Sequence, residues 1–362
     1  GLLSNSDWSG AVWIKRNTSA SDDYSWFRKT SSIPDKNIKR AIAYITACHK
    51  YDLYVNGTIV GKGPAYHYPQ YSYYNAFDIT GNITTNATNC FAVQTHWFGG
   101  GQGRPSGSRG LLVKIQLEYT DGTSATIISD SSWKVHKAHW EEGQPSRNGE
   151  GVGYVDKIDA RDYIENWYGT SYDDSSWPKA SQIGTHPASP WENTLRPDLT
   201  RVIEETITPV SVSDKGGGKY IIDFGKVYAG CPKITFSGGS SGTTVNMRGG
   251  YTLDSGDVST STDQKTDMSY NFILNGETFT FLPMEYLGMR YFQVDNSPCP
   301  LNTSNVKFVK RYFDMDTSKS SFNSNNPTLN DVWDFMKRSI VVCAQEEFVD
   351  TPTREKGGFS GD

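Results

Sequence analysis

The sequence lacks long apolar runs and an excess of positive charge. None of its apolar segments approaches the roughly 20 residues that a membrane-spanning helix needs. Its 35 Lys and Arg residues are outnumbered by 40 Asp and Glu residues, which gives a formal net charge of −5. A nucleic-acid-binding protein would need a basic face. We therefore expect neither a membrane nor a nucleic-acid partner.

Cysteine is also scarce, and its spacing is not that of a metal site. No CxxC pair and no Cys/His pattern typical of zinc is present, so we expect neither a metal nor another cofactor. Two interpretations of the thiols stay open: one or two disulfides in an oxidising compartment, or buried inert thiols. The total is odd, so at least one is free or paired outside the chain, and Cys343 is our candidate. The five cysteines are Cys48, Cys90, Cys231, Cys299 and Cys343.

Aromatic residues, by contrast, are abundant, with 21 Tyr, 16 Phe and 10 Trp. Combined with many small polar residues, this composition is typical of extracellular β proteins. The first residue is Gly1 rather than Met, so either a signal peptide was removed or the chain was trimmed at this end. We favour removal of a signal peptide and expect a secreted protein. About four glycosylation sequons would arise by chance, so their number decides nothing. The candidate glycosylation sites are Asn17, Asn56, Asn82, Asn86 and Asn302.

Strand patterns separated by turn residues fill most of the chain. Asn56-Gly57 predicts a tight hairpin, and Asp121-Gly122 predicts a second turn between strands. We expect a first antiparallel β-sandwich over 1–200, jelly-roll-like and similar to galactose-binding domains, with a loop-rich extension. Its Pro-rich end, from His186, reads as the crossing to the next domain.

A second β-sandwich is expected over 201–313, where six strand-like runs are separated by Gly, Ser and Asn turns. Asn275-Gly276 predicts another tight hairpin within it. The pattern then changes, because Asn326-Pro327 combines a good N-cap with proline at the first helical position. We therefore assign 314–362 to the beginning of a helical domain.

The expected helix carries a single apolar stripe across about five turns. Such a stripe must pack on other helices, and none follows it in this sequence. We therefore expect the remainder of the helical domain, in a separate or missing C-terminal segment, to be a partner of this chain. The stripe consists of Leu329, Val332, Trp333, Met336, Ile340 and Cys343.

The final residues, DTPTREKGGFSGD from Asp350, place three carboxylates and an arginine in one loop. This loop is either a solvated charged segment or a functional site. The segment resembles the DxPxRExxGWxGD signature of α-L-rhamnosidases, glycoside hydrolase family 78. The stretches YDLYVNGTIVG, KIDAR with the following DDSSW, and ILNGETFTFLPMEYLGMRYFQV are similar to the family in the same order. Thr351, Thr353, Phe359 and Met289 depart from its usual residues, which leaves the substrate preference open.

The resemblance implies an (α/α)6-barrel catalytic domain that starts near Met315 and hydrolyses terminal α-L-rhamnose with inversion. Glu355 takes the position of the general acid. Asp350 and Asp362 would hold rhamnose hydroxyls, and Phe359 stands where a ring would stack on the sugar. Arg354 would bind hydroxyls or form a salt bridge that fixes the loop. The family's catalytic base lies downstream and has no match here.

Other interpretations remain. The chain could be a carbohydrate-binding pair of sandwiches without catalysis, or part of a different glycosidase on the same barrel. His96-Trp97-Phe98 could form an accessory sugar-binding surface, although Trp97 could equally be a core residue. The glycine-rich run that follows lacks the GxxxxGK[ST] pattern and a following helix, so we do not expect it to bind phosphate.

Overall fold

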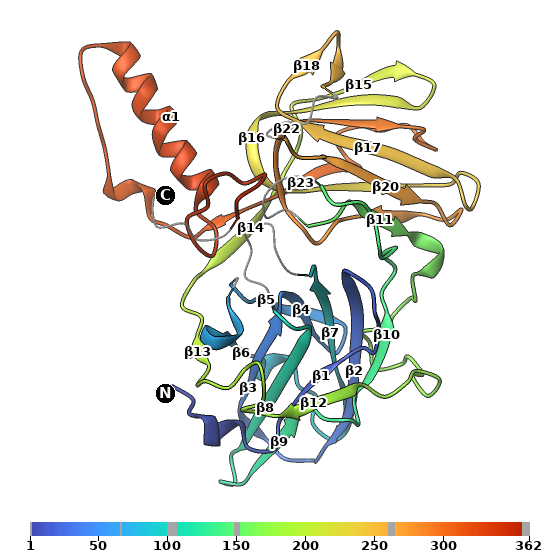
Figure 1. The fold of residues 1–362 in the computed structure, drawn as a ribbon, viewed down its shortest axis with the longest axis vertical. Coiled ribbons are helices and arrows are strands. Elements are labelled where there is room, and N and C mark those ends of the chain that lie inside the picture. Colours follow the sequence, from blue (N-terminus) through green and yellow to red (C-terminus); the bar gives the residue numbers. More distant parts are fainter. Residues whose placement is uncertain (1, 66, 100–106, 148–152, 260–264, 357–362) are drawn as a thin grey trace. The chain divides into compact units, whose positions relative to one another are not determined.

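The structure is a computed structural model that describes residues 2–65, 67–99, 107–147, 153–259 and 265–356. It is mainly β, as predicted, with one α-helix among these residues. Contacts divide the chain into two units (Figure 1). Unit 1 comprises the described residues within 1–143 and 162–199, and unit 2 comprises those within 144–161 and 200–362. The division into three domains at 200 and 313 stays a prediction.

Unit 1 contains two sheets. The first has the order β12-β1-β8-β3-β6-β13, with β9 also paired to β8, and the second has the order β10-β2-β7-β4-β5. All pairs are antiparallel except β13 with β6. The strands are β1 (Val12–Lys15), β2 (Asp23–Ile33), β3 (Ile38–Cys48), β4 (Lys50–Val55), β5 (Thr58–Gly63), β6 (Tyr73–Asp78), β7 (Ala87–Trp97), β8 (Gly110–Tyr119), β9 (Ser124–Ile128), β10 (Lys134–Lys137), β12 (Ser181–Thr185) and β13 (Arg196–Pro197).

One hydrophobic core joins these two sheets. Ile45 of β3 and Val113 of β8 come from the first sheet, and Phe27, Leu53 and Val93 come from the second. All five are buried in the same cluster. Two sheets that share a core between their inner faces form a β-sandwich, and this is the architecture that the alternating strand patterns predicted for this region.

The turns of unit 1 follow their local sequence. Asn56 and Gly57 have φ values of 50° and 88° and connect the antiparallel pair β4 and β5, which confirms the predicted hairpin. Gly122, with φ of 84°, connects β8 and β9 in the same way. The Pro-rich end from His186, which we predict to be the crossing to the next domain, belongs to unit 1 up to Leu199 and packs into its core. Trp191 is fully buried there and stacks on Trp13 with ring centroids 3.9 Å apart, because an apolar ring of this size gains most from burial.

Unit 2 is built on one nine-stranded sheet of the order β11-β20-β17-β22-β16-β23-β14, with β15 and β21 also paired to β16. Two runs that we predicted as separate strands form the single 18-residue strand β16. A short pair, β18 and β19, lies outside this sheet. The strands are β11 (Asp156–Asp159), β14 (Val202–Ile207), β15 (Ser211–Gly216), β16 (Lys219–Phe236), β17 (Thr244–Gly250), β18 (Leu253–Asp254), β19 (Asp257–Val258), β20 (Ser269–Ile273), β21 (Phe279–Phe281), β22 (Leu287–Asp295) and β23 (Val306–Phe313).

The large sheet folds back on itself. Phe236 of β16 stacks on Phe272 of β20 at 5.5 Å between ring centroids, although β22 and β17 separate these strands in the sheet. Only a curved sheet brings the two rings together, and the register of β16 shifts between Asp223 and Tyr228. The predicted Asn275-Gly276 hairpin was wrong: β20 pairs with β17 and β11, whereas β21 pairs with β16. The Asn275 side chain instead closes a local turn by accepting from the Glu277 N–H at 2.9 Å.

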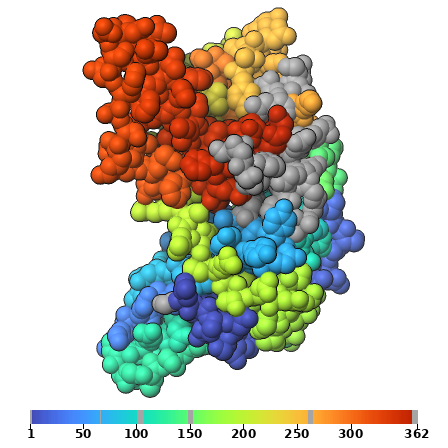
Figure 2. Space-filling model, turned by 60° about the vertical axis from the view of Figure 1, so that its left-hand side comes forward, coloured from blue at the N-terminus to red at the C-terminus, as the bar shows by residue number. Residues whose placement is uncertain are grey.

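Helix α1 (Pro327–Cys343) begins where the sequence predicted it. The Asn326 side chain caps it by accepting from the Thr328 N–H at 3.0 Å, and Pro327 takes the first turn. The helix contacts β23 and β16 of the same unit and projects from their sheet (Figures 1 and 2). No described helix could cross a membrane. Whether α1 begins an (α/α)6 barrel stays a prediction.

The predicted apolar stripe of α1 is largely exposed within unit 2. None of the residues of α1 is fully buried, and Phe335, which the stripe did not include, is the most exposed large apolar side chain on the helix at 69%. Trp333 is shielded in part by Phe322, with ring centroids 5.7 Å apart. The exposed members of the stripe are Leu329, Val332, Met336 and Ile340.

The five cysteines are present as thiols, so the disulfide interpretation was wrong. The neighbours of the buried thiols explain this. Cys48 belongs to an aromatic cluster, and Cys90 accepts from the Arg28 guanidinium at 2.9 Å. Burial raises the pKa of Cys48 to about 12 and that of Cys90 to about 11, so both thiols stay protonated and unreactive at neutral pH.

Arg28 on β2 is the principal polar anchor inside unit 1. Its buried guanidinium donates to the carbonyls of Trp167, Gly169 and Tyr172 at 2.7 to 2.9 Å and forms a 2.9 Å ion pair with Asp174. It therefore holds the segment 167–174 against the five-stranded sheet.

We expect Arg28→Met to destabilise unit 1 by about 3 kcal/mol or more, because the substitution leaves several buried carbonyls and a carboxylate without a donor. Thermal unfolding measures the effect. Lys29→Met, on the adjacent outward-facing residue, is the control and should change little. An equal melting temperature for the two variants would show that Arg28 is not an anchor.

Candidate functional site

The candidate site lies on the segment that follows α1. The Phe313 N–H donates to the Ala344 carbonyl at 2.8 Å, so the helix ends against the end of β23. Ala344 and Phe348 then form a bridge, and Val349 is buried. The chain next reaches Asp350, the first residue of the predicted motif, which is exposed.

Two consecutive motif residues are buried against the start of β22. The Thr353 hydroxyl, fully buried, donates to the Gly288 carbonyl at 3.2 Å and also contacts the Tyr251 hydroxyl. Pro352 lies over Gly288, where an added Cβ would stand only 2.5 Å from the proline ring. The backbone can approach β22 this closely because residue 288 has no side chain.

Lys356 forms the next anchor. Its side chain is fully buried, and its ammonium donates to the Glu285 carboxylate at 2.8 Å. It also donates to the Tyr286 carbonyl and lies 3.8 Å from the centre of the Tyr286 ring. The opposite charge of Glu285 and the aromatic face compensate the cost of removing this ammonium from water.

The same tyrosine ring carries a second cation. The Arg311 guanidinium of β23 lies 4.4 Å from the Tyr286 ring centre and forms a 2.6 Å ion pair with Glu346, just after α1. Tyr286 is 1% exposed. Glu346 and Lys356 therefore attach the segment to one buried ring from both ends, with Asp350 between them.

The predicted acid, Glu355, lies next to the Lys356 anchor. Its carboxylate pairs with the Arg354 guanidinium at 2.6 Å, and both side chains are partly exposed, at 28% for Arg354 and 22% for Glu355. Glu355 adopts a φ of 52°, which is uncommon for a residue other than glycine. Of the two roles expected for Arg354, this structure shows the salt bridge within the loop. Phe359 and Asp362 lie outside the described residues.

The residues that hold the motif, Lys356 with Glu285 and Tyr286, were not predicted from the sequence. We read Lys356 as a variable motif position and gave Glu285 and Tyr286 no role. A lysine directly after the candidate acid, and a Glu-Tyr pair directly before β22, were the available signals. Neither signal predicts that Lys356 contacts Glu285, because the two residues are 71 positions apart in the sequence.

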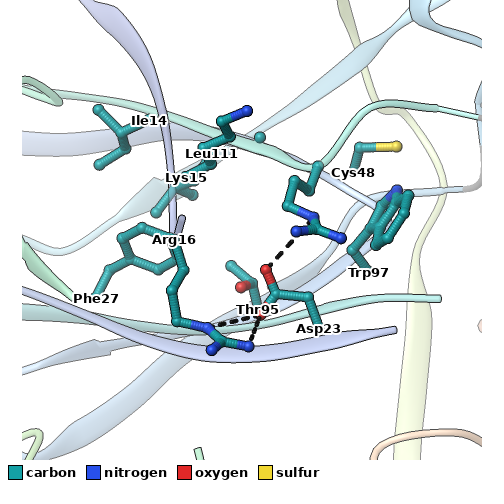
Figure 3. Close-up of a pocket in the computed structure, with 11 residues that line it drawn as sticks. Ile14, Lys15, Arg16, Asp23, Phe27, Cys48, Thr95, Trp97 and Leu111 are labelled. Atoms are coloured by element: carbon teal, nitrogen blue, oxygen red, sulfur yellow. Dashed lines mark hydrogen bonds and ion pairs between the residues drawn. The ribbon is translucent and has the colours of Figure 1, made fainter. Parts of the chain in front are cut away.

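A small pocket in unit 1 is lined in part by Trp97, which we predicted as part of an accessory sugar-binding surface (Figure 3). His96 and Phe98 are buried, so of the three residues Trp97 alone is partly exposed. The Arg109 guanidinium covers its ring at 4.3 Å, and Arg109 and Arg16 both pair with Asp23. In this structure the Trp97 ring is therefore covered by Arg109, and the Asp23 carboxylate is paired with two arginines. A sugar-binding role for Trp97 stays a prediction.

The candidate glycosylation sites differ in exposure. Asn17, Asn86 and Asn302 are exposed, whereas Asn56 and Asn82 are half-buried. The Asn56 amide donates to the Asn82 carbonyl and to the Asn89 side chain at 2.8 and 2.7 Å. A glycan on Asn56 would disrupt this network.

We expect Gly288→Ala to release the motif from β22, because the new Cβ would meet Pro352, the Tyr251 hydroxyl and Thr353 at 2.5 to 3.0 Å. Faster tryptic cleavage after Arg354 would report the release. Gly81→Ala is the control, since its Cβ would have no atom within 4 Å. Unchanged cleavage in Gly288→Ala would contradict the seating of the loop on β22.

Comparison with known proteins identifies relatives over the whole chain. The family model "Alpha-L-rhamnosidase N-terminal domain" matches residues 36–208, and "Bacterial alpha-L-rhamnosidase concanavalin-like domain" matches residues 213–311. An α-L-rhamnosidase of Streptomyces avermitilis is 27% identical over 91% of this chain and 32% of its own length. One of Formosa agariphila is 25% identical over 100% of this chain and 41% of its own length. The chain thus spans about a third to two fifths of these relatives.

Solved structures agree. The α-L-rhamnosidase of Aspergillus terreus has a TM-score of 0.83 at 25% identity and covers 98% of this chain and 42% of its own. That of Dictyoglumus thermophilum has a TM-score of 0.84 at 23% identity, over 100% and 42%. A Streptomyces avermitilis α-L-rhamnosidase complexed with L-rhamnose has a TM-score of 0.78 at 22% identity, over 92% and 33%. The chain belongs to the α-L-rhamnosidase family and corresponds to an N-terminal part of its members.

Proposed function

We propose that this chain is part of a secreted glycoside hydrolase that removes terminal α-L-rhamnose from rhamnosides or polysaccharides with inversion of configuration. The observation that carries the proposal is the position of the motif. It lies shortly after α1 and is held by buried contacts with Gly288 of β22 and with Glu285 just before that strand, while Asp350, Arg354 and Glu355 remain accessible. A solvated charged loop would have no need of such anchors.

Glu355 is proposed as the general acid. An inverting glycosidase uses one carboxyl group to protonate the departing oxygen and another, about 6.5 to 9.5 Å away, to activate water on the opposite face of the sugar. Glu355 must exchange its present partner Arg354 for the glycosidic oxygen when substrate binds. The base is proposed to lie in the part of the enzyme that follows residue 362.

The remaining motif residues are proposed to bind rhamnose. Carboxylates accept hydrogen bonds from sugar hydroxyls, and Asp350 is exposed at the start of the loop. Asp362 is proposed for the same role and Phe359 for stacking on the sugar ring. Arg354, once released by Glu355, could donate to a hydroxyl from its guanidinium.

The open face of α1 is proposed to pack against further helices of an (α/α)6 barrel. Its exposed apolar side chains have fractional exposures between 46% and 69%. Burying five of them is worth on the order of 10 kcal/mol in area terms, so the face favours a helical partner over water.

In the full-length enzyme we expect Glu355→Gln to abolish cleavage of an alkyl or sugar-linked rhamnoside while part of the rate on a dinitrophenyl rhamnoside survives. A poor leaving group needs the proton, whereas dinitrophenolate departs without it. Steady-state kinetics on the two substrates measure the difference.

Asp350→Asn is the matched control for this experiment. It should slow both substrates alike, because a hydroxyl contact supports the transition state whatever the aglycone is. Equal losses on both substrates for Glu355→Gln would remove Glu355 as the acid. Absence of rhamnoside hydrolysis by the full-length enzyme would refute the proposed function itself.

A polypeptide of these 362 residues alone is expected to be inactive and to bind a hydrophobic dye through α1. Phe335→Asp combined with Met336→Lys should lower dye binding, because both side chains are more than half exposed. Asp334→Ser, at an exposed polar position of the same helix, should not. Rhamnosidase activity of the 362-residue polypeptide would contradict the need for a partner.

A further inference from the structure

The Lys356–Glu285 ion pair is unusual in where it lies. Its side chains are 0% and 3% exposed, and it joins the residue after Glu355 to the residue before Tyr286. A buried ion pair contributes little net stability compared with apolar residues of the same size, because both charges lose their hydration. The main effect of this pair is to fix the position of the motif backbone at Lys356 relative to Glu285.

The geometry that it fixes is that of Glu355. Lys356 is the next residue along the chain, so an ammonium held at 2.8 Å from Glu285 and 3.8 Å from the Tyr286 ring centre leaves the Glu355 backbone little freedom. Glu355 holds a φ of 52°, a conformation that surrounding contacts must enforce in a residue with a side chain. On the other side of Glu355, Thr353 is fully buried against Gly288.

We infer that Lys356 and Glu285 are positioning residues for Glu355: their buried pair sets the direction in which the Glu355 carboxyl group meets the departing oxygen. The inference rests on the proposed function. Lys356 does not touch the substrate. It acts through the backbone of its neighbour, and Glu285 acts through Lys356.

The structure offers a matched control within unit 2. Arg147 and Asp156 form a second buried pair, 0% and 1% exposed and 3.0 Å apart, and the Arg147 guanidinium lies 4.6 Å from the Tyr270 ring centre. This pair has the same composition of cation, carboxylate and tyrosine ring, but it holds β11 and the residues around 267–269 rather than the motif.

The experiment compares Glu285→Gln and Lys356→Met with Asp156→Asn in the full-length enzyme. An error of about 1 Å in the placement of a catalytic group costs on the order of 100-fold in rate. We expect a loss of that order in kcat on an alkyl rhamnoside for the first two variants, a much smaller loss on a dinitrophenyl rhamnoside, and little change in KM. Asp156→Asn should lower the melting temperature without separating the two substrates.

Further readouts test whether Lys356 and Glu285 act on the rate through Glu355. In a Glu355→Gln background, Lys356→Met should cause no additional loss, because the group that it positions is already absent. Tryptic cleavage after Arg354 should accelerate in Glu285→Gln and Lys356→Met but not in Asp156→Asn. Lys356→Arg, which keeps the charge, should recover part of the alkyl-rhamnoside rate. If Lys356→Met does not fold, Glu285→Gln carries the same comparison.

The outcomes separate the two proposals. If the wild-type enzyme does not hydrolyse rhamnosides, the proposed function and this inference both fall. If the wild type and Glu355→Gln behave as expected, the function stands. In that case, equal losses on both substrates for Glu285→Gln, or additive losses with Glu355→Gln, would overturn the positioning role alone.

Discussion

The arrangement around the candidate site depends on one buried aromatic ring, that of Tyr286. Lys356 and Arg311 both place their charge against it, at 3.8 and 4.4 Å from its centre. Because Arg311 also holds Glu346, the ring joins the end of α1, the strand β23 and the motif into one assembly. A ring face attracts cations most strongly where water is excluded, and Tyr286 is almost fully buried.

This construction assigns different tasks to the β-sheet and to the loop. The start of β22 and the two residues directly before it supply fixed points: the Gly288 carbonyl, the Glu285 carboxylate and the Tyr286 ring. The loop supplies the exposed chemistry at Asp350, Arg354 and Glu355. A catalytic carboxyl group on an unsupported loop would sample many orientations, whereas buried anchors at and beside a strand reduce that freedom before substrate arrives. The β domains of such an enzyme would then have a direct part in catalysis.

The features that the sequence predicted well are local ones. The Asn56-Gly57 hairpin and the Asn326-Pro327 helix start depend on the φ preferences and capping of adjacent residues. The Asn275-Gly276 hairpin prediction failed because strands distant in the sequence decide the pairing. β20 pairs with β17, and β21 pairs with β16. The motif was found by resemblance, but its anchors on Glu285 and Tyr286 were not, since only the fold brings residues so far apart in sequence together. The roles of Asp350, Glu355 and the residues beyond 356 stay predictions.

The most direct test of the central claim is a crystal structure of the full-length enzyme with L-rhamnose bound. With the α anomer bound, whose anomeric oxygen takes the place of the departing oxygen, we expect the Glu355 carboxyl group to lie about 3 Å from that oxygen, with Lys356 still paired to Glu285. Rhamnose bound away from the 350–356 loop, or Glu355 still paired to Arg354 and directed away from the sugar, would contradict it.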